Sequence, residues 1–302
     1  MRIAVVIVTF NRWEYLKSAL SAILPQLSPQ DAVFVIDNGS SDGTRKLLPR
    51  TFPAVRVLLA DENVGGAGGF AFGLDLAMAE GFSHAWLMDD DGEPAPDALA
   101  ELVHAVDDQP DAPWWTSTTW FYRGTVEQAR RGESLTPAIP GTDGKFGTLP
   151  ARRATFVGLL VNLDVARREP LPVADFFIWH DDSEYTARLS RATAGVRSLS
   201  SSIIHPFKAE YVDFGERLRY DIRNRIWILR SRKLGARWLR SEELVTIPKV
   251  IVKQALKSRR KSVYLRCLAQ GVFEGWFTKP RVEERGSLLT RWSTWEVLSP
   301  SS

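Results

Sequence analysis

The 302-residue sequence contains a single cysteine and lacks any long apolar run. One cysteine cannot form an internal disulfide framework, which favours a reducing compartment. No apolar stretch reaches the roughly 18 residues that a membrane-spanning helix requires. The opening residues, MRIAVVIVTFNR, have no small-residue cleavage site and predict a first strand rather than a signal peptide. These absences predict a cytoplasmic protein.

Charge is divided unevenly along the chain. The formal net charge is only +3. Residues 217–292, however, contain 20 Lys and Arg against 6 Asp and Glu, whereas residues 1–216 contain 19 against 29. With 44% hydrophobic residues the composition is that of an ordinary globular protein. We therefore predict an acidic body over residues 1–215 and a basic, amphipathic helical region over residues 216–302.

Four apolar runs in the first 110 residues predict buried strands. After each strand come turn residues and then apolar residues at helical spacing, as in FAFGLDLAMAEG (70–81), for which we expect a helix after a glycine-rich turn. Strand–turn–helix units in this order predict an α/β fold with a doubly wound, Rossmann-like and mostly parallel sheet covered by helices. The four runs are IAVVIVTF (3–10), DAVFVID (31–37), AVRVLLA (54–60) and HAWLM (84–88).

A polar cluster follows each of these strands. Ligands of doubly wound sheets bind beyond the carboxyl ends of the strands. Each cluster alone can be explained as a capped turn, because Asn, Asp, Gly and Ser suit such positions. Together they predict one site. The clusters are TFNR (9–12), DNGSSDG (37–43), DENVGGAGG (61–69) and DDDG (89–92).

The three consecutive aspartates are the strongest indication of chemistry. In an extended backbone Asp89 and Asp91 point to one side and Asp90 to the other. Carboxylates on the same side raise each other's pKa unless a cation neutralises them. Mg²⁺ and Mn²⁺ prefer oxygen ligands and often complete their shell with substrate phosphate. A metal–diphosphate site is therefore favoured over a solvated acidic surface.

The glycine-rich cluster allows a second interpretation. Gly66-x-Gly68-x-x-Ala71, with Asp89 ending the next strand, has the spacing of a dinucleotide fingerprint and would suit an NAD(P)-binding oxidoreductase. That fingerprint normally follows the first strand, whereas these glycines follow the third, and a ribose site needs one acid instead of three. The cluster is not followed by Lys-Ser/Thr, which argues against a P-loop.

Several runs together resemble a known family. VVIVTFNR, VIDNGSSDGT, NVGGAGGF and WLMDDDG are similar to the nucleotide-binding half of family 2 glycosyltransferases with the GT-A fold. ENVGGAGGFAFG with DDDG resembles, more narrowly, bacterial galactofuranosyltransferases and related rhamnosyltransferases. The similarity resumes in FFIWHDDSEYTARL (176–189), IIHP (203–206) and RYDIRNR (219–225). It implies a nucleotide-sugar half over about 1–110 and an acceptor half over about 111–215.

The resemblance also implies roles for individual residues. Asp182 matches the catalytic base, with Asp181 as second choice, and the metal ligands for Mn²⁺ or Mg²⁺ match Asp89, Asp91 and His205. The implied reaction is an inverting single displacement. The positions that match the donor-binding residues are Thr9, Asn11, Arg12, Asp37, Asn63, Gly65, Gly66 and Asp90.

Other features have plainer explanations beside the functional ones. Asp181, Asp182 and Glu184 begin a predicted helix, where acids are favourable in any protein, and Glu184 and Arg188 are spaced for an ion pair. Trp179 and His180 could shape an acceptor pocket. Large aromatics more often fill cores than stack on sugars, so we expect core packing for Trp114, Trp115 and Trp120.

The basic region interleaves Trp, Ile, Leu and Val with Arg and Lys from residue 220 onward. Basic amphipathic helices with Trp are typical of anionic membrane surfaces, and no nucleic-acid-binding signature is present. We predict peripheral contact with the inner face of the cell membrane. The favoured reaction is transfer from UDP-galactofuranose to a glycan or polyprenyl-linked acceptor. The alternatives are dTDP-rhamnose as donor, the oxidoreductase, and a non-catalytic sugar-nucleotide or nucleic-acid-binding module.

Overall fold

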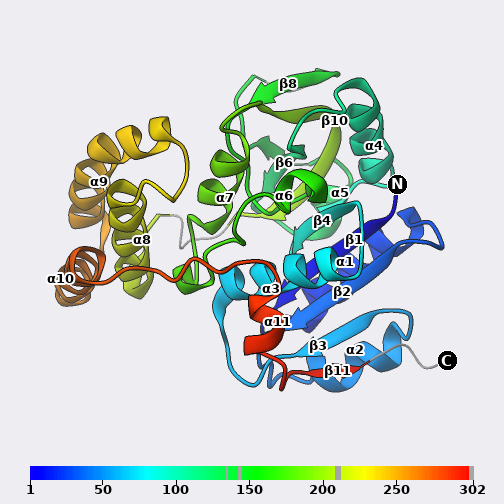
Figure 1. The fold of residues 1–302 in the computed structure, drawn as a ribbon, viewed down its shortest axis with the longest axis horizontal. Coiled ribbons are helices and arrows are strands. Elements are labelled where there is room, and N and C mark those ends of the chain that lie inside the picture. The colour runs from blue at the N-terminus through cyan, green and yellow to red at the C-terminus, as the bar shows by residue number, and fades with distance from the viewer. Residues whose placement is uncertain (134, 142–144, 208–211, 299–302) are drawn as a thin grey trace.

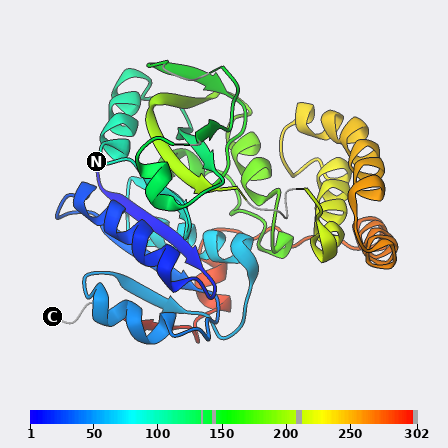
Figure 2. The same cartoon turned by 180° about the vertical axis from the view of Figure 1, so that it is seen from behind.

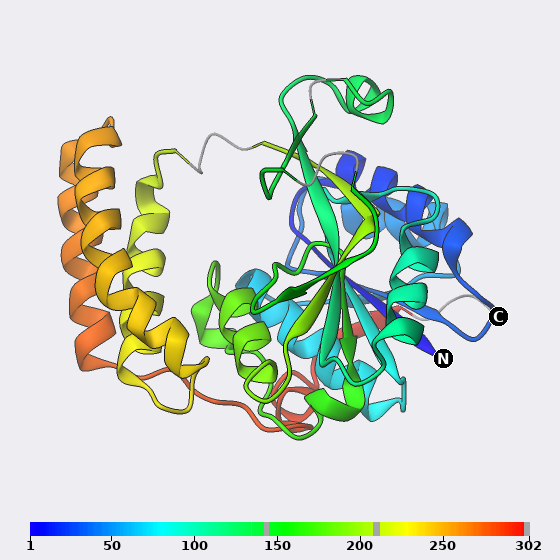
Figure 3. The same cartoon turned by 90° about the horizontal axis from the view of Figure 1, so that it is seen from above.

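The computed structural model describes residues 1–133, 135–141, 145–207 and 212–298. An α/β body holds the sheet, and three long helices lie side by side at one flank of it (Figures 1 and 3). The α/β fold predicted from the sequence is confirmed. The chain leaves the body at helix α8, forms the helical layer, and returns to the body at its C-terminal end (Figure 1).

The sheet has a parallel core at its N-terminal half. β1 pairs in parallel with β2 and with β4, and β2 pairs in parallel with β3. The observed order is β11-β3-β2-β1-β4-β9-β6-β10-β5, with β7 on β6 and β8 on β10. The strands are β1 (Ile3–Thr9), β2 (Ala32–Asp37), β3 (Arg56–Leu59), β4 (His84–Asp89), β5 (Glu93–Pro94), β6 (Trp114–Tyr122), β7 (Leu135–Pro137), β8 (Thr148–Ala151), β9 (Leu159–Asn162), β10 (Gly195–Pro206) and β11 (Glu296–Leu298).

Helices cover both faces of the sheet, and each face has its own apolar core (Figure 2). Successive side chains of a strand point to opposite faces, so strand β1, which is apolar up to its last residue Thr9, contributes to both cores. Trp114 and Trp115 are fully buried, as expected, and lie in different cores. The helices of the body are α1 (Trp13–Ile23), α2 (Thr44–Thr51), α3 (Gly65–Ala79), α4 (Ala98–Asp108), α5 (Val126–Arg130), α6 (Leu163–Ala166), α7 (Asp181–Leu189) and α11 (Ser287–Arg291).

Helix α3 corrects the prediction for the glycine-rich segment. The helix begins at Gly65, five residues before the predicted start, so the glycines form its first turns instead of a loop. A Cβ at Gly69 would lie 2.6 Å from a Val8 methyl carbon, and one at Gly73 would lie 2.3 Å from a Val6 methyl carbon. These glycines allow α3 to approach β1 closely, which outweighs the entropic cost of glycine in a helix. Close helix–strand packing therefore explains the glycines at positions 69 and 73, whereas Gly66 has open space beside it.

The helical layer consists of α8 (Leu218–Arg230), α9 (Arg237–Lys257) and α10 (Lys261–Phe277). Within it α8 packs against α10 through a small apolar cluster. No helix in the described part of the chain is both long and apolar enough to cross a bilayer.

Residues 287–298 were predicted to belong to the basic helical region, but the structure places them on the body. Residues 287–298 lie on the body, where β11 pairs with β3 and α11 packs on α3 (Figure 1). The buried Asp75 carboxylate accepts hydrogen bonds from the N–H groups of Gly286, Leu288 and Leu289 and so fixes this return. The division at residue 216 as a domain boundary stays a prediction.

Candidate active site

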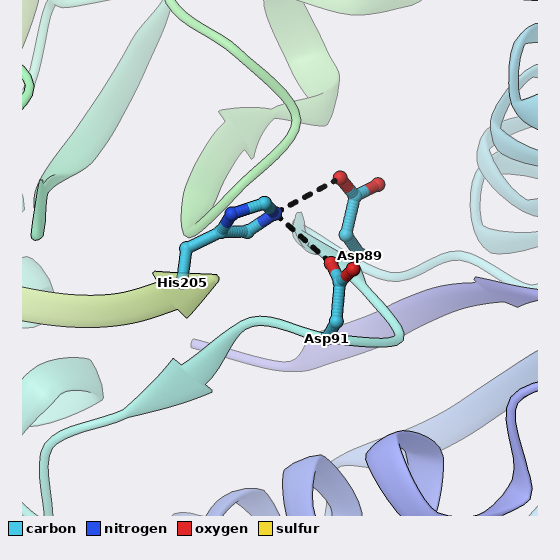
Figure 4. Close-up of side chains that lie close together, drawn as sticks. All are labelled: Asp89, Asp91 and His205. Atoms are coloured by element: carbon cyan, nitrogen blue, oxygen red, sulfur yellow. Dashed lines mark ion pairs between the residues drawn. The ribbon is translucent and has the colours of Figure 1, made fainter. Parts of the chain in front are cut away.

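Two strand ends bring together two carboxylates and an imidazole. Asp89 ends β4, Asp91 lies two residues later, and His205 lies near the end of β10 (Figure 4). His205 Nε2 lies 2.9 Å from Asp91 Oδ1 and 3.8 Å from Asp89 Oδ2. One potential ligand atom from each residue lies within 4.8 Å of the others. Residues 114 positions apart in sequence therefore form one cluster at the sheet edge.

The donor set fits Mn²⁺ or Mg²⁺. Carboxylate oxygens are the ligands both ions prefer, and Mn²⁺ readily accepts an imidazole nitrogen as well. The other ring nitrogen, His205 Nδ1, lies 2.9 Å from the Pro206 carbonyl oxygen, to which it donates. This hydrogen bond directs Nε2 toward the carboxylates. Metal-binding histidines are commonly oriented by such a bond from their other ring nitrogen.

The first turn of the sheet contacts the same aspartates. Thr9 Oγ1 donates to Asp90 Oδ2 at 2.9 Å. Arg12 donates to Asp90 Oδ1 at 3.1 Å and to Asp91 Oδ2 at 2.8 Å. The aspartate run is thus contacted by Arg12 on one side and by His205 on the other.

Burial and these partners shift the pKa values of the cluster. Burial lowers the pKa of His205, but its hydrogen bonds with Asp89 and Asp91 outweigh that effect and raise the pKa to about 9. Burial raises the pKa of Asp90 to about 7, against the opposing effect of Arg12. The charges of Arg12, His205 and the aspartates therefore influence one another.

Two of the predicted nucleotide contacts are Asn11, in the turn after β1, and Asp37, at the end of the neighbouring strand β2. Asn11, in the left-handed conformation, accepts hydrogen bonds from the backbone N–H groups of Ser41 and Asp42. The fully buried Asp37 carboxylate accepts from Ser40 N at 2.9 Å and from Arg45 Nε at 3.1 Å. Both oxygens of Asp37 thus already have protein partners, and its predicted contact with a base or ribose stays a prediction.

The start of α3 is held by contacts within the chain, from the Asn63 side chain and the Phe177 backbone. Asn63 Oδ1 accepts from Gly65 N at 2.8 Å. A Cβ at Gly65 would lie 2.0 Å from the Phe177 carbonyl oxygen, so glycine is required there by a contact within the chain. At Gly66, by contrast, a Cβ would meet nothing within 4 Å. We predicted that the donor approaches this segment, and the space beside Gly66 is open.

The two candidate bases begin helix α7. Burial raises the pKa of Asp181 well above its ordinary value, and the neighbouring Asp182 and Asp89 carboxylates raise it further. Burial also raises the pKa of Asp182, with a contribution from Asp89, although hydrogen bonds from Ser183 oppose it. The charge of Asp89 therefore influences both acids that begin α7. Asp181 is buried, whereas Asp182 is only half-buried, which makes Asp182 the more accessible proton acceptor of the two.

The segment before α7 has an unusual backbone. Phe177, Trp179 and His180 all have positive φ, at 64°, 66° and 72°. Each such non-glycine residue costs about 1–3 kcal/mol, and such conformations cluster at functional sites. The predicted pocket residues Trp179 and His180 thus belong to a strained segment, residues 177–180, that leads directly into Asp181 and Asp182.

Helix α8 holds this strained segment in place. The fully buried Asn224 Nδ2 lies 3.0 Å from each of the carbonyl oxygens of Phe176, Ile178 and Trp179, to which it donates. His180 Nε2 lies 2.7 Å from Asp221 Oδ1. Sequence reasoning missed Asp221 and Asn224. The available signal was the family similarity that resumes in RYDIRNR (219–225), a stretch that contains both residues.

The expected Glu184–Arg188 pair is present but buried. Its Nε–Oε1 distance is 2.7 Å, and the side chains are 0% and 1% exposed. Arg188 also donates to the Pro170 and Leu171 carbonyls, and Glu184 accepts from Gly235 N. These additional hydrogen bonds offset part of the cost of burying the two charges. It anchors α7 to the connection between α8 and α9.

Comparison with known proteins places these observations in a family. The α/β fold with a mostly parallel sheet is that of GT-A glycosyltransferases. Residues 4–163 match the model of glycosyl transferase family 2, and the chain belongs to that family.

Relatives that match most of this chain include two galactofuranosyltransferases. The chain is 30% identical to galactofuranosyltransferase GlfT1 of Mycobacterium tuberculosis over 274 residues, 78% of this chain and 86% of the relative. It is 28% identical to GlfT1 of Mycolicibacterium smegmatis over 269 residues, 79% and 87% of the two chains. The predicted resemblance is confirmed.

A solved structure extends the likeness of fold. Mannosyltransferase PcManGT from Pyrobaculum calidifontis, solved with GDP-Man and Mn²⁺, superposes with a TM-score of 0.59 at 16% identity. The match covers 91% of this chain and 87% of that one. At this identity the match supports the fold alone. Membership of the glycosyltransferase family argues against the oxidoreductase interpretation.

Proposed function

We propose that the chain transfers galactofuranose from UDP-galactofuranose to an acceptor hydroxyl, with inversion and with Mn²⁺ or Mg²⁺ bound. The observation that carries this proposal is the cluster of Asp89, Asp91 and His205 beside the two acids that begin α7. The named activity of the relatives, at 28–30% identity, supports the donor sugar.

In this proposal Asp89, Asp91 and His205 hold the ion. The ion would supply positive charge opposite the negative charge that develops on the leaving diphosphate. Thr9 and Arg12 fix Asp90 and Asp91, so the aspartate run keeps its shape as the donor binds. Asn63 and the α3 start, with Gly66 open, provide the surface that the donor approaches. Asn11 and Asp37 provide the neighbouring surface for the nucleoside.

Asp182 acts as the base. Its carboxylate takes the proton of the acceptor hydroxyl as that oxygen bonds to the anomeric carbon and the bond from the anomeric carbon to the diphosphate breaks. Asp181 is the second choice, because its side chain is buried whereas Asp182 is only half-buried. The reaction needs one base, and single displacement inverts the anomeric centre.

A panel of sugar nucleotides tests the donor. With Mn²⁺ present, UDP-galactofuranose is expected to raise the thermal unfolding midpoint because a ligand that binds only the folded chain stabilises it. UDP-glucose and dTDP-rhamnose serve as matched competitors. A larger Mn²⁺-dependent shift with dTDP-rhamnose would favour the rhamnosyltransferase, and no shift with any sugar nucleotide would contradict the proposal.

We further propose that the acceptor is a glycan or a polyprenyl-linked glycolipid and that the helical layer contacts an anionic membrane. The layer presents exposed apolar side chains among its many basic ones, and such surfaces complement anionic lipid. On α9 these are Leu244, Val245, Val252 and Leu256, and on α10 they are Leu265, Phe273, Trp276 and Phe277.

Sedimentation with phospholipid vesicles tests the membrane contact. Phe277, 75% exposed, is the probe, and Phe146, 83% exposed on the body, is the matched control. Phe277→Ser is expected to weaken vesicle binding by about tenfold, since an aromatic side chain would no longer enter the lipid. Phe146→Ser should bind like the wild type. A wild-type chain that stays in solution with anionic vesicles would disprove the contact.

A further inference from the structure

Five arginines surround a hollow that the catalytic proposal does not use. It has a volume of about 600 Å³ and lies where the end of α7, the segment after β8 and the start of α9 meet. We call it the arginine hollow, and its arginines are Arg152, Arg191, Arg232, Arg237 and Arg240. The lining also contains Trp238 and Ser190 but no carboxylate.

These arginines are poorly neutralised by the protein. Among the described residues, the one carboxylate within ion-pair distance of any of them is Glu169, 3.7 Å from Arg191. Arg191 also donates to the backbone carbonyls of Lys233 and Gly235. The side chains of Arg152, Arg232 and Arg237 have no hydrogen-bond partner within the described ranges. Burial and the positive charges of Arg191, Arg232 and Arg237 lower the pKa of Arg240.

Further hydrogen-bond donors lie at the same place. Arg237 and Trp238 begin the 21-residue helix α9, and the N–H groups of a first helical turn have no acceptor within the helix. The Ser190 hydroxyl is buried and has no hydrogen-bond partner among the described residues. Planar guanidinium groups beside a helix N-terminus recognise phosphate oxygens well.

The hollow is separate from the candidate active site. Asp181 and Asp182 begin α7, whereas Ser190 and Arg191 follow its end. A helix of nine residues spans roughly 13 Å. The hollow therefore lies at the far end of α7 from the strand ends and from the aspartate cluster. Figure 3 shows α7 between the sheet and the helical layer.

We propose that the arginine hollow binds a phosphate-bearing anion of at least diphosphate size. Five like charges on one surface repel one another, and a polyanion would remove that repulsion while the α9 N-terminus adds its N–H groups. A single phosphate would leave most of a hollow of this volume unfilled. The phosphate can belong to a soluble diphosphate or to an anionic lipid headgroup.

Inorganic pyrophosphate tests the site by calorimetry, with EDTA present to keep the metal cluster empty. Arg152→Ser/Arg237→Ser is expected to weaken pyrophosphate binding at least about tenfold, because charge-assisted hydrogen bonds are lost. The matched control is Arg259→Ser/Arg260→Ser, which removes the same charge. Residues 259 and 260 follow α9 at its other end, roughly 31 Å away for a 21-residue helix.

Vesicles then separate the two sources of phosphate. Phosphatidylcholine vesicles with and without phosphatidylglycerol are compared for the wild type and both double variants. Weaker binding of Arg152→Ser/Arg237→Ser to the anionic vesicles, beyond the loss in the control, assigns the site to a lipid headgroup. Unchanged vesicle binding with weakened pyrophosphate binding assigns it to a soluble anion. Undetectable pyrophosphate binding by the wild type, or equal affinity in all three proteins, overturns the proposal. Equal unfolding midpoints without ligand verify that both variants are folded.

Discussion

Asp182→Asn is expected to lower the rate of sugar transfer by about a hundredfold to ten-thousandfold, the range that general bases contribute. An amide of the same shape cannot take the proton of the acceptor hydroxyl. The affinity for UDP should stay close to that of the wild type, because Asp182 begins α7 and is no member of the metal cluster. Initial rates with saturating donor, and UDP titration in the presence of Mn²⁺, measure the two quantities. Equal loss of both would remove Asp182 from the role of base.

Asp181→Asn is the matched comparison for this variant. Burial and its neighbours favour the neutral form of Asp181, so the amide should reproduce most of its native interactions and cost much less activity. The pH profile gives a second readout. A base works only when ionised, so the wild-type rate should fall as pH drops through the pKa of Asp182, which burial raises. The residual rate of Asp182→Asn should lack that decline. A stronger loss in Asp181→Asn would transfer the role to Asp181.

Asp89→Ala is expected to weaken Mn²⁺-dependent UDP binding at least about tenfold, a loss that even an outer-shell partner can cause at a metal site. The variant removes one of the three proposed ligands. Calorimetry of UDP binding with Mn²⁺, and again with EDTA, measures the effect. In EDTA the wild type and the variant should bind UDP equally weakly.

Asp89 is a cleaner probe of the metal than its neighbour Asp91. The Asp89 side chain is 40% exposed, whereas that of Asp91 is 1% exposed and contacts both Arg12 and His205. Replacing Asp91 would remove the nearer carboxylate of both Arg12 and His205, and breaking a buried pair destabilises by about 3–5 kcal/mol. Asp108→Asn, an exposed acid at the end of α4, is the control. Undiminished Mn²⁺-dependent binding by Asp89→Ala would exclude the metal site.

The sheet was predictable because its central strands are continuous apolar runs. Such runs, each followed by turn residues, have few alternatives to a buried parallel strand. The start of α3 was not predictable, since glycine usually ends helices, and only the contacts with Val6 and Val8 explain it. The return of residues 287–298 was missed for another reason. β11 is a three-residue strand whose partner β3 lies more than 230 positions earlier, and so short a pairing has no sequence pattern of its own.

The candidate site was predictable in part. The aspartate run follows from charge and strand position, whereas His205 could be chosen only through the family resemblance. The contacts of Asn224 could not be predicted, because its partners are backbone carbonyls. The positive φ angles of Phe177, Trp179 and His180 had no signal either, since FIWH contains neither glycine nor asparagine.

Hydrogen bonds from α8 hold residues 176–180, so the candidate active site depends on more of the chain than the nucleotide-binding fold. A fragment ending before residue 218 would keep the aspartate run, His205 and the Asp182 side chain itself. It would lose Asn224 and Asp221, and the costly backbone before α7 would relax toward ordinary conformations. Grafting or trimming experiments that treat the helical layer as a detachable anchor would therefore separate the nucleotide from the base that must act beside it.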